Sequence, residues 1–160
     1  MKISKSREKY LLEIFFGTTR KKDIPEHLSQ FGFRDFETSD EDLFFITQYI
    51  LSIDRLILGG SLITENGLSF LKKLKNVKEL DLRSLPLDDN NLDSILHFEN
   101  LEYLYIKFTN ITSKGISTIL RSFPKLRILV AEIKESETHL IALWEKEYPE
   151  VELNISYQNS

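Results

Sequence analysis

The side chains in this sequence that could do acid–base chemistry are few, and their spacing does not assemble a catalytic centre. Glu41-Asp42 and Asp88-Asp89 are adjacent carboxylates. Side chains of consecutive residues do not face each other, so neither pair converges on one substrate atom. Acidic residues are favoured in the first turn of a helix, where they interact with the positive end of the helix dipole. We therefore interpret both pairs as helix-start acids.

Metal binding, phosphate binding and covalent catalysis also lack their usual patterns. The chain has no cysteine, which excludes a disulfide framework, a thiolate zinc site and a cysteine nucleophile. The histidines His27, His97 and His139 are separated by 70 and 42 residues, so no local ligand pair exists. The segment Gly59–Ser61 lacks the GxxxxGKS or GxxxxGKT spacing of a phosphate loop and predicts a tight bend after a strand. We expect no enzyme activity, no cofactor and no metal.

Length and composition are those of one globular domain. The chain has 160 residues, of which 41% are hydrophobic and 29% charged, and a domain of this size buries about 70% of its unfolded surface. No apolar stretch approaches the ~20 residues that cross a bilayer. The apolar run Tyr10–Phe16 is interrupted by Glu13 and is followed by no small-residue cleavage site, unlike a secretory signal. We expect a cytoplasmic protein without a membrane contact.

Charge is distributed unevenly along the chain. The net charge is −4, but residues 1–22 hold seven Lys or Arg and two Asp or Glu, which leaves −9 for the remainder. A basic start of this kind is typical either of a solvated helix face or of a contact with nucleic acid or a membrane surface. We favour the solvated face. Attachment to nucleic acid or membrane is the alternative, and binding that weakens steeply with salt would reveal it.

One spacing of aliphatic residues recurs four times along the chain. Positions one, four and six of each unit are aliphatic, and successive units start 24, 24 and 25 residues apart. The four sets are Ile53/Leu56/Leu58, Val77/Leu80/Leu82, Leu101/Leu104/Ile106 and Leu126/Leu129/Ala131. Alternating apolar positions predict a short strand with one buried face in each unit.

Each predicted strand is followed by a pattern typical of a helix. Thr64, Asp88 and Thr112 stand where a helix needs an oxygen to accept from its first N–H groups. The stretches that follow have apolar residues at helical spacing, a stripe that faces back to the strand. One strand and one helix cannot cover their own apolar faces, so neighbouring units must stack. We predict an α/β fold, a short solenoid with a parallel sheet on its concave side and helices on its convex side.

These segments resemble the leucine-rich repeat family. The LxxLxL pattern is present in Leu101–Ile106 and, with Val at its first position, in Val77–Leu82. Ile63–Leu71 and Ile111–Leu120 are similar to the I-T-x-x-G-L segment of the helix-bearing repeats found in ribonuclease-inhibitor-like and F-box-associated proteins. The resemblance covers residues 53 to about 133 well. It implies the solenoid just described and a role in binding other proteins.

The resemblance has departures. The family's Asn or Cys after the strand, whose side chain bonds the loop backbone, is replaced by Ser61, Leu85, Thr109 and Lys134. The loops must therefore be satisfied in another way. The fourth unit lacks a polar cap in phase, and the segment 151–156 predicts a last strand that closes the array, a role that such arrays need.

The first 52 residues do not follow the repeat. A helix is expected near residues 3–16, ending at Gly17, and a second over Asp40–Leu51, with Ser39 as its cap and Asp42 at the third position. We assign residues 1–52 to a helical N-terminal cap and residues 53–160 to four repeats with a capping strand. An F-box-like adaptor segment in residues 1–52 is the alternative, although no convincing pattern supports it.

Positions three, five and seven of each strand should point to the concave surface. The candidate protein-binding residues are Arg55, Ile57, Glu79, Asp81, Arg83, Tyr103, Tyr105, Lys107, Ile128, Val130 and Glu132, with Phe108 and Ile133 at the flank. Neighbouring tyrosines and aliphatics with charged residues around them indicate an interface centre with a polar rim. Large side chains that merely pack along a sheet are the other explanation, and a shift of one residue would exchange the two faces.

Two hypotheses for function follow. The first is a non-enzymatic protein-binding module, most concretely a small inhibitor or a bacterial immunity-type protein that neutralises a cognate toxin by occlusion. The charge of −9 beyond residue 22 favours a basic partner, such as a basic toxin or nuclease, through complementarity. The second is an adaptor or assembly factor, in which residues 1–52 contact one protein and the concave face another.

Overall fold

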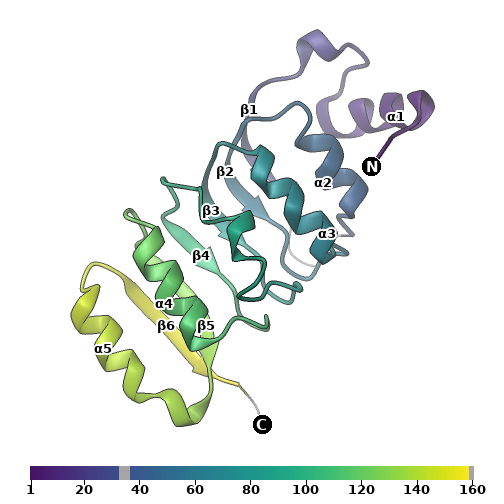
Figure 1. Ribbon diagram of the computed structural model, residues 1–160. Helices are drawn as coiled ribbons and strands as arrows, with labels where there is room; N and C mark the ends of the chain where they lie inside the picture. Colours follow the sequence, from purple (N-terminus) through teal and green to yellow (C-terminus); the bar gives the residue numbers. More distant parts are fainter. Residues whose placement is uncertain (33–36, 159–160) are drawn as a thin grey trace.

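The protein is an α/β protein with a six-stranded, all-parallel open sheet (Figure 1). The computed structural model describes residues 1–32 and 37–158. The strands follow one another in chain order across the sheet. They are β1 (His27–Phe31), β2 (Ser52–Ile57), β3 (Asn76–Asp81), β4 (Tyr103–Tyr105), β5 (Ile128–Ile133) and β6 (Glu152–Tyr157).

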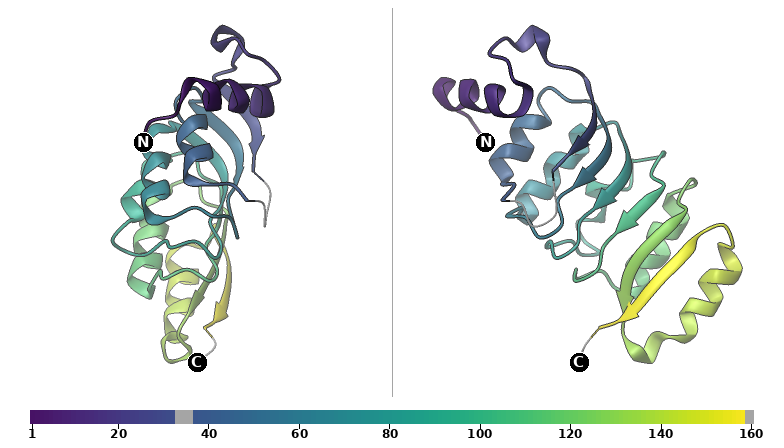
Figure 2. Two further views of the ribbon diagram at one scale, coloured as in Figure 1. Left: turned by 90° about the vertical axis from the view of Figure 1, so that its right-hand side faces the viewer. Right: turned by 180° about the vertical axis from the view of Figure 1, so that it is seen from behind.

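Helices lie on one face of this sheet. The α-helices are α1 (Lys5–Phe16), α2 (Asp40–Ile46), α3 (Glu65–Leu68), α4 (Ser113–Ser122) and α5 (His139–Glu147). Four short 3₁₀ segments complete the described part: η1 (Lys21–Asp23), η2 (Ser69–Lys73), η3 (Leu92–Ser94) and η4 (Glu135–Glu137). Figure 2 shows α2 to α5 together on one side of the sheet, whereas its other side carries no helix of the described residues. We call that second side the helix-free face.

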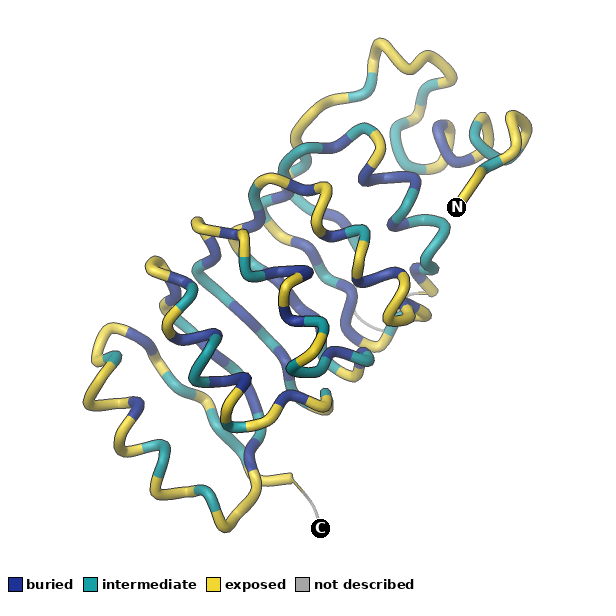
Figure 3. Tube along the Cα trace, in the orientation of Figure 1, coloured by how far each residue is buried: buried dark blue, intermediate teal, exposed yellow. Residues whose placement is uncertain are grey.

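The strand register matches equal positions of neighbouring units. Ile53 pairs with Val77, and Leu80 pairs with Leu104, residues that are 24 apart in sequence. The two inner apolar positions of the four units are at most 2% exposed. Figure 3 shows buried stretches both along the strands and along the helices beside them. The expected parallel sheet and the expected inward face of each strand are therefore confirmed.

Two helix starts are held by an aspartate from an earlier part of the chain. Thr112 Oγ1 accepts a hydrogen bond from Gly115 N at 3.5 Å, as expected for a cap. The same threonine donates its hydroxyl and its main-chain N–H to Asp89, at 2.5 and 2.9 Å. Thr64 makes the equivalent pair of bonds to Asp40, at 2.6 and 2.8 Å. Asp89 therefore connects two consecutive units, a role beyond that of a helix-start acid, and Asp40 connects the N-terminal segment to the first unit in the same way.

The segment after Asp88 differs from its expected helix. Only a single 3₁₀ turn forms there, η3, although Ile95 and Phe98 are fully buried as the apolar pattern requires. Asp88 Oδ1 accepts from the N–H groups of Asn90 and Asn91, at 2.9 and 3.0 Å. These bonds close a tight local turn, so the α-helix expected in this unit is wrong.

The first 52 residues contain more than helices. The sequence pattern predicts no strand there, but β1 pairs with β2 in parallel and adds a sixth strand to the sheet. The helix expected over Asp40–Leu51 ends at Ile46. Its start is as expected, because Ser39 and Asp42 form a reciprocal capping box. The strand expected at 151–156 is β6, which pairs with β5 along its whole length.

Candidate functional site

The helix-free face presents two rows of the candidate residues, because equal positions of neighbouring strands lie side by side. Position three contributes one row, Arg55, Glu79, Tyr103 and Ile128. Position five contributes the second row, Ile57, Asp81, Tyr105 and Val130. Residues of the edge strands that are outside the candidate set extend both rows. These residues are Gln30, Glu152 and Asn154.

Charged side chains on this face neutralise one another across neighbouring strands. Arg55 Nε lies 3.0 Å from Glu79 Oε1. Two further pairs, absent from the candidate set, lie at or just before the amino ends of the strands: Lys78 Nζ with Asp54 Oδ1 at 2.9 Å, and Arg127 Nε with Glu102 Oε2 at 3.3 Å. The signal for them was in the sequence, since these positions alternate in sign at the repeat spacing. The charged part of the face therefore attracts no partner by a large net charge.

Asp81 is the buried centre of the charged end. It is 3% exposed, and its carboxylate accepts from Arg83 at three donors, the Nε at 2.8 Å, the main-chain N at 3.1 Å and the Nη2. A buried carboxylate requires such compensation, because desolvation penalises its charged form. Asp81 thereby fixes the guanidinium of Arg83 over the ring of Tyr105, 5.2 Å from its centroid.

A hollow of about 260 Å³ opens between these side chains. It is lined by Arg55, Ile57, Glu79, Asp81, Arg83 and Tyr105. Burial raises the pKa of Tyr105, and the carboxylate of Glu79 adds to the rise. The phenol is therefore neutral at physiological pH. It can donate a hydrogen bond to a bound group and accept one from it.

The uncharged end of the face is formed by β4 and β5. Tyr103, Tyr105, Ile128 and Val130 are half-buried, so each leaves part of its side chain open to contact. Their registry places Tyr103 beside Ile128 and Tyr105 beside Val130. The structure thus brings the aromatic and aliphatic candidates together as neighbours. Lys107 and Glu132, also half-buried, follow at the carboxyl ends of the same strands.

The turns after three successive strands, β2 to β4, share a left-handed residue, a conformation that favours glycine. Gly60 has a φ angle of 72° after β2. Ser84 and Phe108 adopt φ of 60° and 59° at the corresponding places after β3 and β4. Main-chain bonds tie these turns together, with Gly60 N donating to Arg83 O and Ser84 N donating to Lys107 O, at 2.9 and 3.0 Å. This bonding replaces the side-chain ladder that the loops lack.

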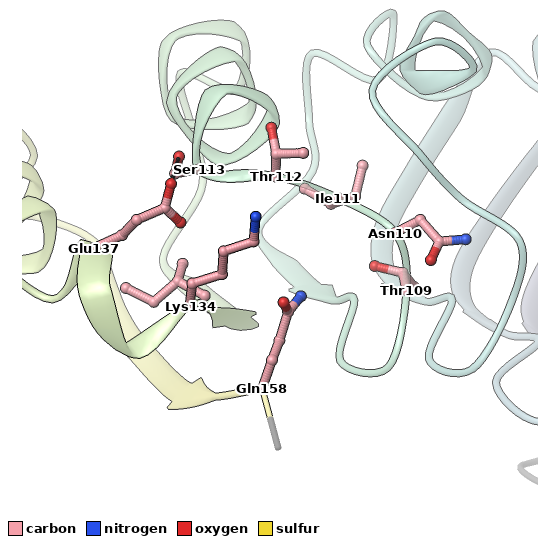
Figure 4. Close-up of a pocket in the computed structure, with 9 residues that line it drawn as sticks. Thr109, Asn110, Ile111, Thr112, Ser113, Lys134, Glu137 and Gln158 are labelled. Carbon is pink, nitrogen blue, oxygen red and sulfur yellow. Dashed lines mark hydrogen bonds between the residues drawn. The ribbon is translucent and has the colours of Figure 1, made fainter. Parts of the chain in front are cut away.

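A second hollow lies beside the start of α4, between the turns after β4 and β5 (Figure 4). Its volume is about 230 Å³. Figure 4 shows Lys134 and Gln158 reaching into it, whereas Glu137 is bound by the hydroxyl of Ser113 at 3.0 Å. The lining combines hydroxyls, amides, one ammonium group, one carboxylate and two isoleucine side chains, and it does not include a cluster of carboxylates or imidazoles.

Among the residues that the structure describes, no group of three His, Cys, Asp or Glu could hold a metal ion. His97 has a structural contact, since its Nε2 lies 2.9 Å from Leu74 O. Within the same described ranges, no helix is long and apolar enough to cross a membrane.

The architecture defines a class, an α/β protein whose parallel sheet has helices on one face and an open second face. Comparison of the chain with models of known protein families finds no matching family. Comparison with curated proteins finds no significant match.

Proposed function

We propose that the chain is a leucine-rich-repeat solenoid that binds another protein with its helix-free face. Strand order equal to chain order and the pairing of residues one unit apart support the solenoid. The I-T-x-x-G segments support it too, because Thr64 and Thr112 cap helices in the same way. A stack of such units builds an extended surface suited to protein binding.

One observation carries the binding role. The half-buried group Tyr103, Tyr105, Ile128 and Val130 lies next to side chains whose charges are already paired. An apolar and aromatic centre with a polar surround is the anatomy of a protein interface. Tyrosine is enriched among the residues that dominate binding energy, since it combines a large apolar ring with a polar end.

The most concrete form of this function is a small inhibitor, of the bacterial immunity type, that covers the active site of a cognate toxin. The charge of −9 beyond residue 22 favours a basic partner such as a nuclease. The charges on β2 and β3 neutralise one another, so it is the overall negative charge that acts at long range and accelerates encounter. The apolar group on β4 and β5 then holds the complex.

An adaptor is the second candidate, and one observation favours it. Helix α1 turns Tyr10 and Ile14 outward, with exposed fractions of 50% and 58%, and Arg7 lies over the Tyr10 ring. This is a second surface, separate from the helix-free face. In an adaptor, α1 contacts one protein and the helix-free face contacts another.

Affinity purification from the source cells, followed by mass spectrometry, tests both. The tagged chain is compared with Tyr103→Ala/Tyr105→Ala and with a control, Tyr10→Ala/Ile14→Ala, that truncates apolar side chains on the other surface. We expect one stoichiometric protein that is lost only with Tyr103→Ala/Tyr105→Ala. Calorimetry with that protein, once purified, then measures the affinity. A toxic enzyme inhibited in vitro supports the inhibitor. A protein lost only with the α1 variant supports the adaptor, and a protein retained by both variants contradicts both assignments.

A further inference from the structure

We propose that the hollow lined by Arg55, Glu79 and Tyr105 binds one carboxylate, an aspartate or glutamate side chain that the partner inserts into the helix-free face. The inference rests on the proposed protein-binding function. It adds a polar specificity site on β2 to β4 to the apolar group on β4 and β5.

The walls of this hollow are held in place by neighbouring strands. The hollow has a volume of about 260 Å³, and its buried residue Asp81 binds two nitrogens of the Arg83 guanidinium. A Cβ on Gly59 would lie 2.6 Å from Asp81 Oδ1, so the glycine of the preceding unit leaves the room that this carboxylate occupies. A bound side chain therefore need not order the wall beneath it, which lowers the entropic cost of binding.

The open side of the hollow offers hydrogen-bond donors. The side chain of Arg55 is 52% exposed, against 23% for Glu79, with which it pairs. Arg55 uses its Nε for Glu79, and its two terminal nitrogens donate no hydrogen bond to any residue in 1–32 or 37–158. A carboxylate matches these two nitrogens, because its two oxygens accept their N–H groups side by side.

The hydroxyl of Tyr105 is a further donor at the same place. It has no hydrogen-bond partner within the part of the chain that the structure describes. Burial raises the pKa of Tyr105, the carboxylate of Glu79 adds to the rise, and the charge of Arg55 opposes it. The phenol therefore keeps its proton at physiological pH and can donate it to an oxygen of the carboxylate that Arg55 binds.

The charges of the lining favour a ligand with a single negative charge. Two arginines and two acidic residues line the hollow, so their formal charges cancel. A dianion such as phosphate would meet Glu79 and Asp81 without an excess of positive charge to balance it. A carboxylate places its one charge on the exposed guanidinium of Arg55, and a basic partner can supply this one acidic side chain.

The N-acetylated α-amide of glutamate is the probe, because its only charge is the side-chain carboxylate. We follow the NMR signals of the arginine Nε–H groups as the probe is added to the intact, isotope-labelled chain. The Arg55 signal should shift saturably, with a dissociation constant on the order of 1 mM for a ligand of this size. The corresponding amide of glutamine should bind at least about tenfold more weakly, since it lacks the charge.

Three variants assign the site. Arg55→Gln should weaken the probe at least about tenfold, followed at the Arg83 signal, and Tyr105→Phe, which removes only the hydroxyl, at least about threefold. Arg127 is the matched control, because it makes the same kind of pair, with Glu102 at 3.3 Å, but lies outside this hollow. Its signal should not saturate, and Arg127→Gln should leave the affinity within about twofold.

The indole N–H signal of Trp144 reports whether each variant is folded. Trp144 is the single tryptophan, is buried, and donates to Ser117 Oγ at 3.0 Å. If Arg55→Gln alters this signal, Tyr105→Phe decides. Equal shifts at Arg55 and Arg127, equal affinity for the glutamine probe, tighter binding of inorganic phosphate, or no saturable shift would each overturn the inference.

The probe also separates this inference from the proposed function. If the probe does not bind, yet a captured protein is lost with Tyr103→Ala/Tyr105→Ala, the carboxylate site alone fails. If the probe binds and no protein is captured, the assignment of the carboxylate to a partner fails together with the proposed function. If both hold, Arg55→Gln should weaken the captured protein at least about tenfold, whereas Arg127→Gln should keep its affinity within about twofold.

Discussion

Asp89 and Thr112 form a clamp between two consecutive units of the fold. The carboxylate accepts both the main-chain N–H and the hydroxyl of the threonine, at 2.9 and 2.5 Å, and Thr112 in turn accepts from Gly115 N. A Cβ on Gly115 would overlap the Asp89 carboxylate. The glycine of the I-T-x-x-G segment is thus required by a side chain that comes from the unit before it.

Removing the clamp should destabilise the fold. Asp89→Ala leaves the start of α4 without its charged acceptor, and we expect a loss of about 1–2 kcal/mol in the free energy of unfolding, since hydrogen bonds to a charged group are worth roughly that much. Gly115→Ala should also destabilise, because the methyl group displaces Asp89. The free energies of unfolding of the wild type, the two single variants and the double variant, measured in urea, form a double-mutant cycle. A double variant as unstable as the sum of the two would contradict this shared origin.

Strain at Ser84 predicts a substitution that stabilises. Ser84 has φ of 60°, and a left-handed residue with a Cβ costs about 1–2 kcal/mol. Glycine at position 84 would remove this strain. Part of the resulting gain in stability is offset, because glycine loses more chain entropy on folding. We expect Ser84→Gly to raise the free energy of unfolding by about 0.5–1 kcal/mol, as measured by urea denaturation. The reverse substitution at the corresponding turn, Gly60→Ser, is the control and should destabilise, since Gly60 has φ of 72°.

The attachment of α1 should depend on pH through Glu8. Its carboxylate accepts from Lys21 Nζ and from the hydroxyl of Tyr49, both at 2.8 Å. The bond with Lys21 is the larger cause, and that with Tyr49 the next, of a pKa below the ordinary 4.5. A pKa that is lower in the folded state contributes stability above the unfolded pKa, and this contribution is lost as the pH falls through the folded pKa.

Glu8→Gln tests this linkage. We expect the variant to be less stable than the wild type at pH 7, and the difference to shrink as the solution is acidified below the ordinary pKa of a glutamate. Urea unfolding at pH 7 and at about pH 3 measures it. Glu13→Gln, on the same helix, is the control. A Glu8→Gln difference that persists unchanged in acid would argue against the linkage.

The buried side of helix α1 should contribute to the stability of the fold, whereas its exposed side should not. Leu11 and Leu12 are 1% and 3% exposed, so Leu11→Ala should cost about 2–5 kcal/mol in the free energy of unfolding. Tyr10→Ala/Ile14→Ala alters exposed positions and should change it by less than about 0.5 kcal/mol. Denaturant melts of the two variants compare these effects. If Leu11→Ala is as stable as the wild type, α1 is not packed as described.

The strands were predictable because alternation assigns each residue to a face. In 77–82 and 101–106 the aliphatic spacing marks the inner positions directly, and the register follows from the equal spacing of the units. Strand β1 was not predictable in this way. Its apolar residues Leu28 and Phe31 are three apart, so they lack the period of two that marks a strand.

The positions of the candidate residues in the sheet were predictable, and their interactions were less so. The candidate residues of β3, β4 and β5 lie where the repeat placed them. Sequence spacing could not show that Asp81 is buried beneath Arg83, since that depends on side-chain packing. Nor could it show that Phe108 is left-handed, because a phenylalanine gives no signal for a turn that glycine usually occupies.

The order of strands in the sheet, which is the order of the chain, has a consequence for how the protein forms. Every strand pairs only with its neighbours in sequence, and the β2–β3 pairing closes a loop of 24 residues. Loops of that length close at little entropic cost, so the nascent chain can add each strand as soon as it is synthesised. We therefore expect strand pairing to spread between neighbours along the sheet, and the two outermost strands to be the first to exchange their amide hydrogens.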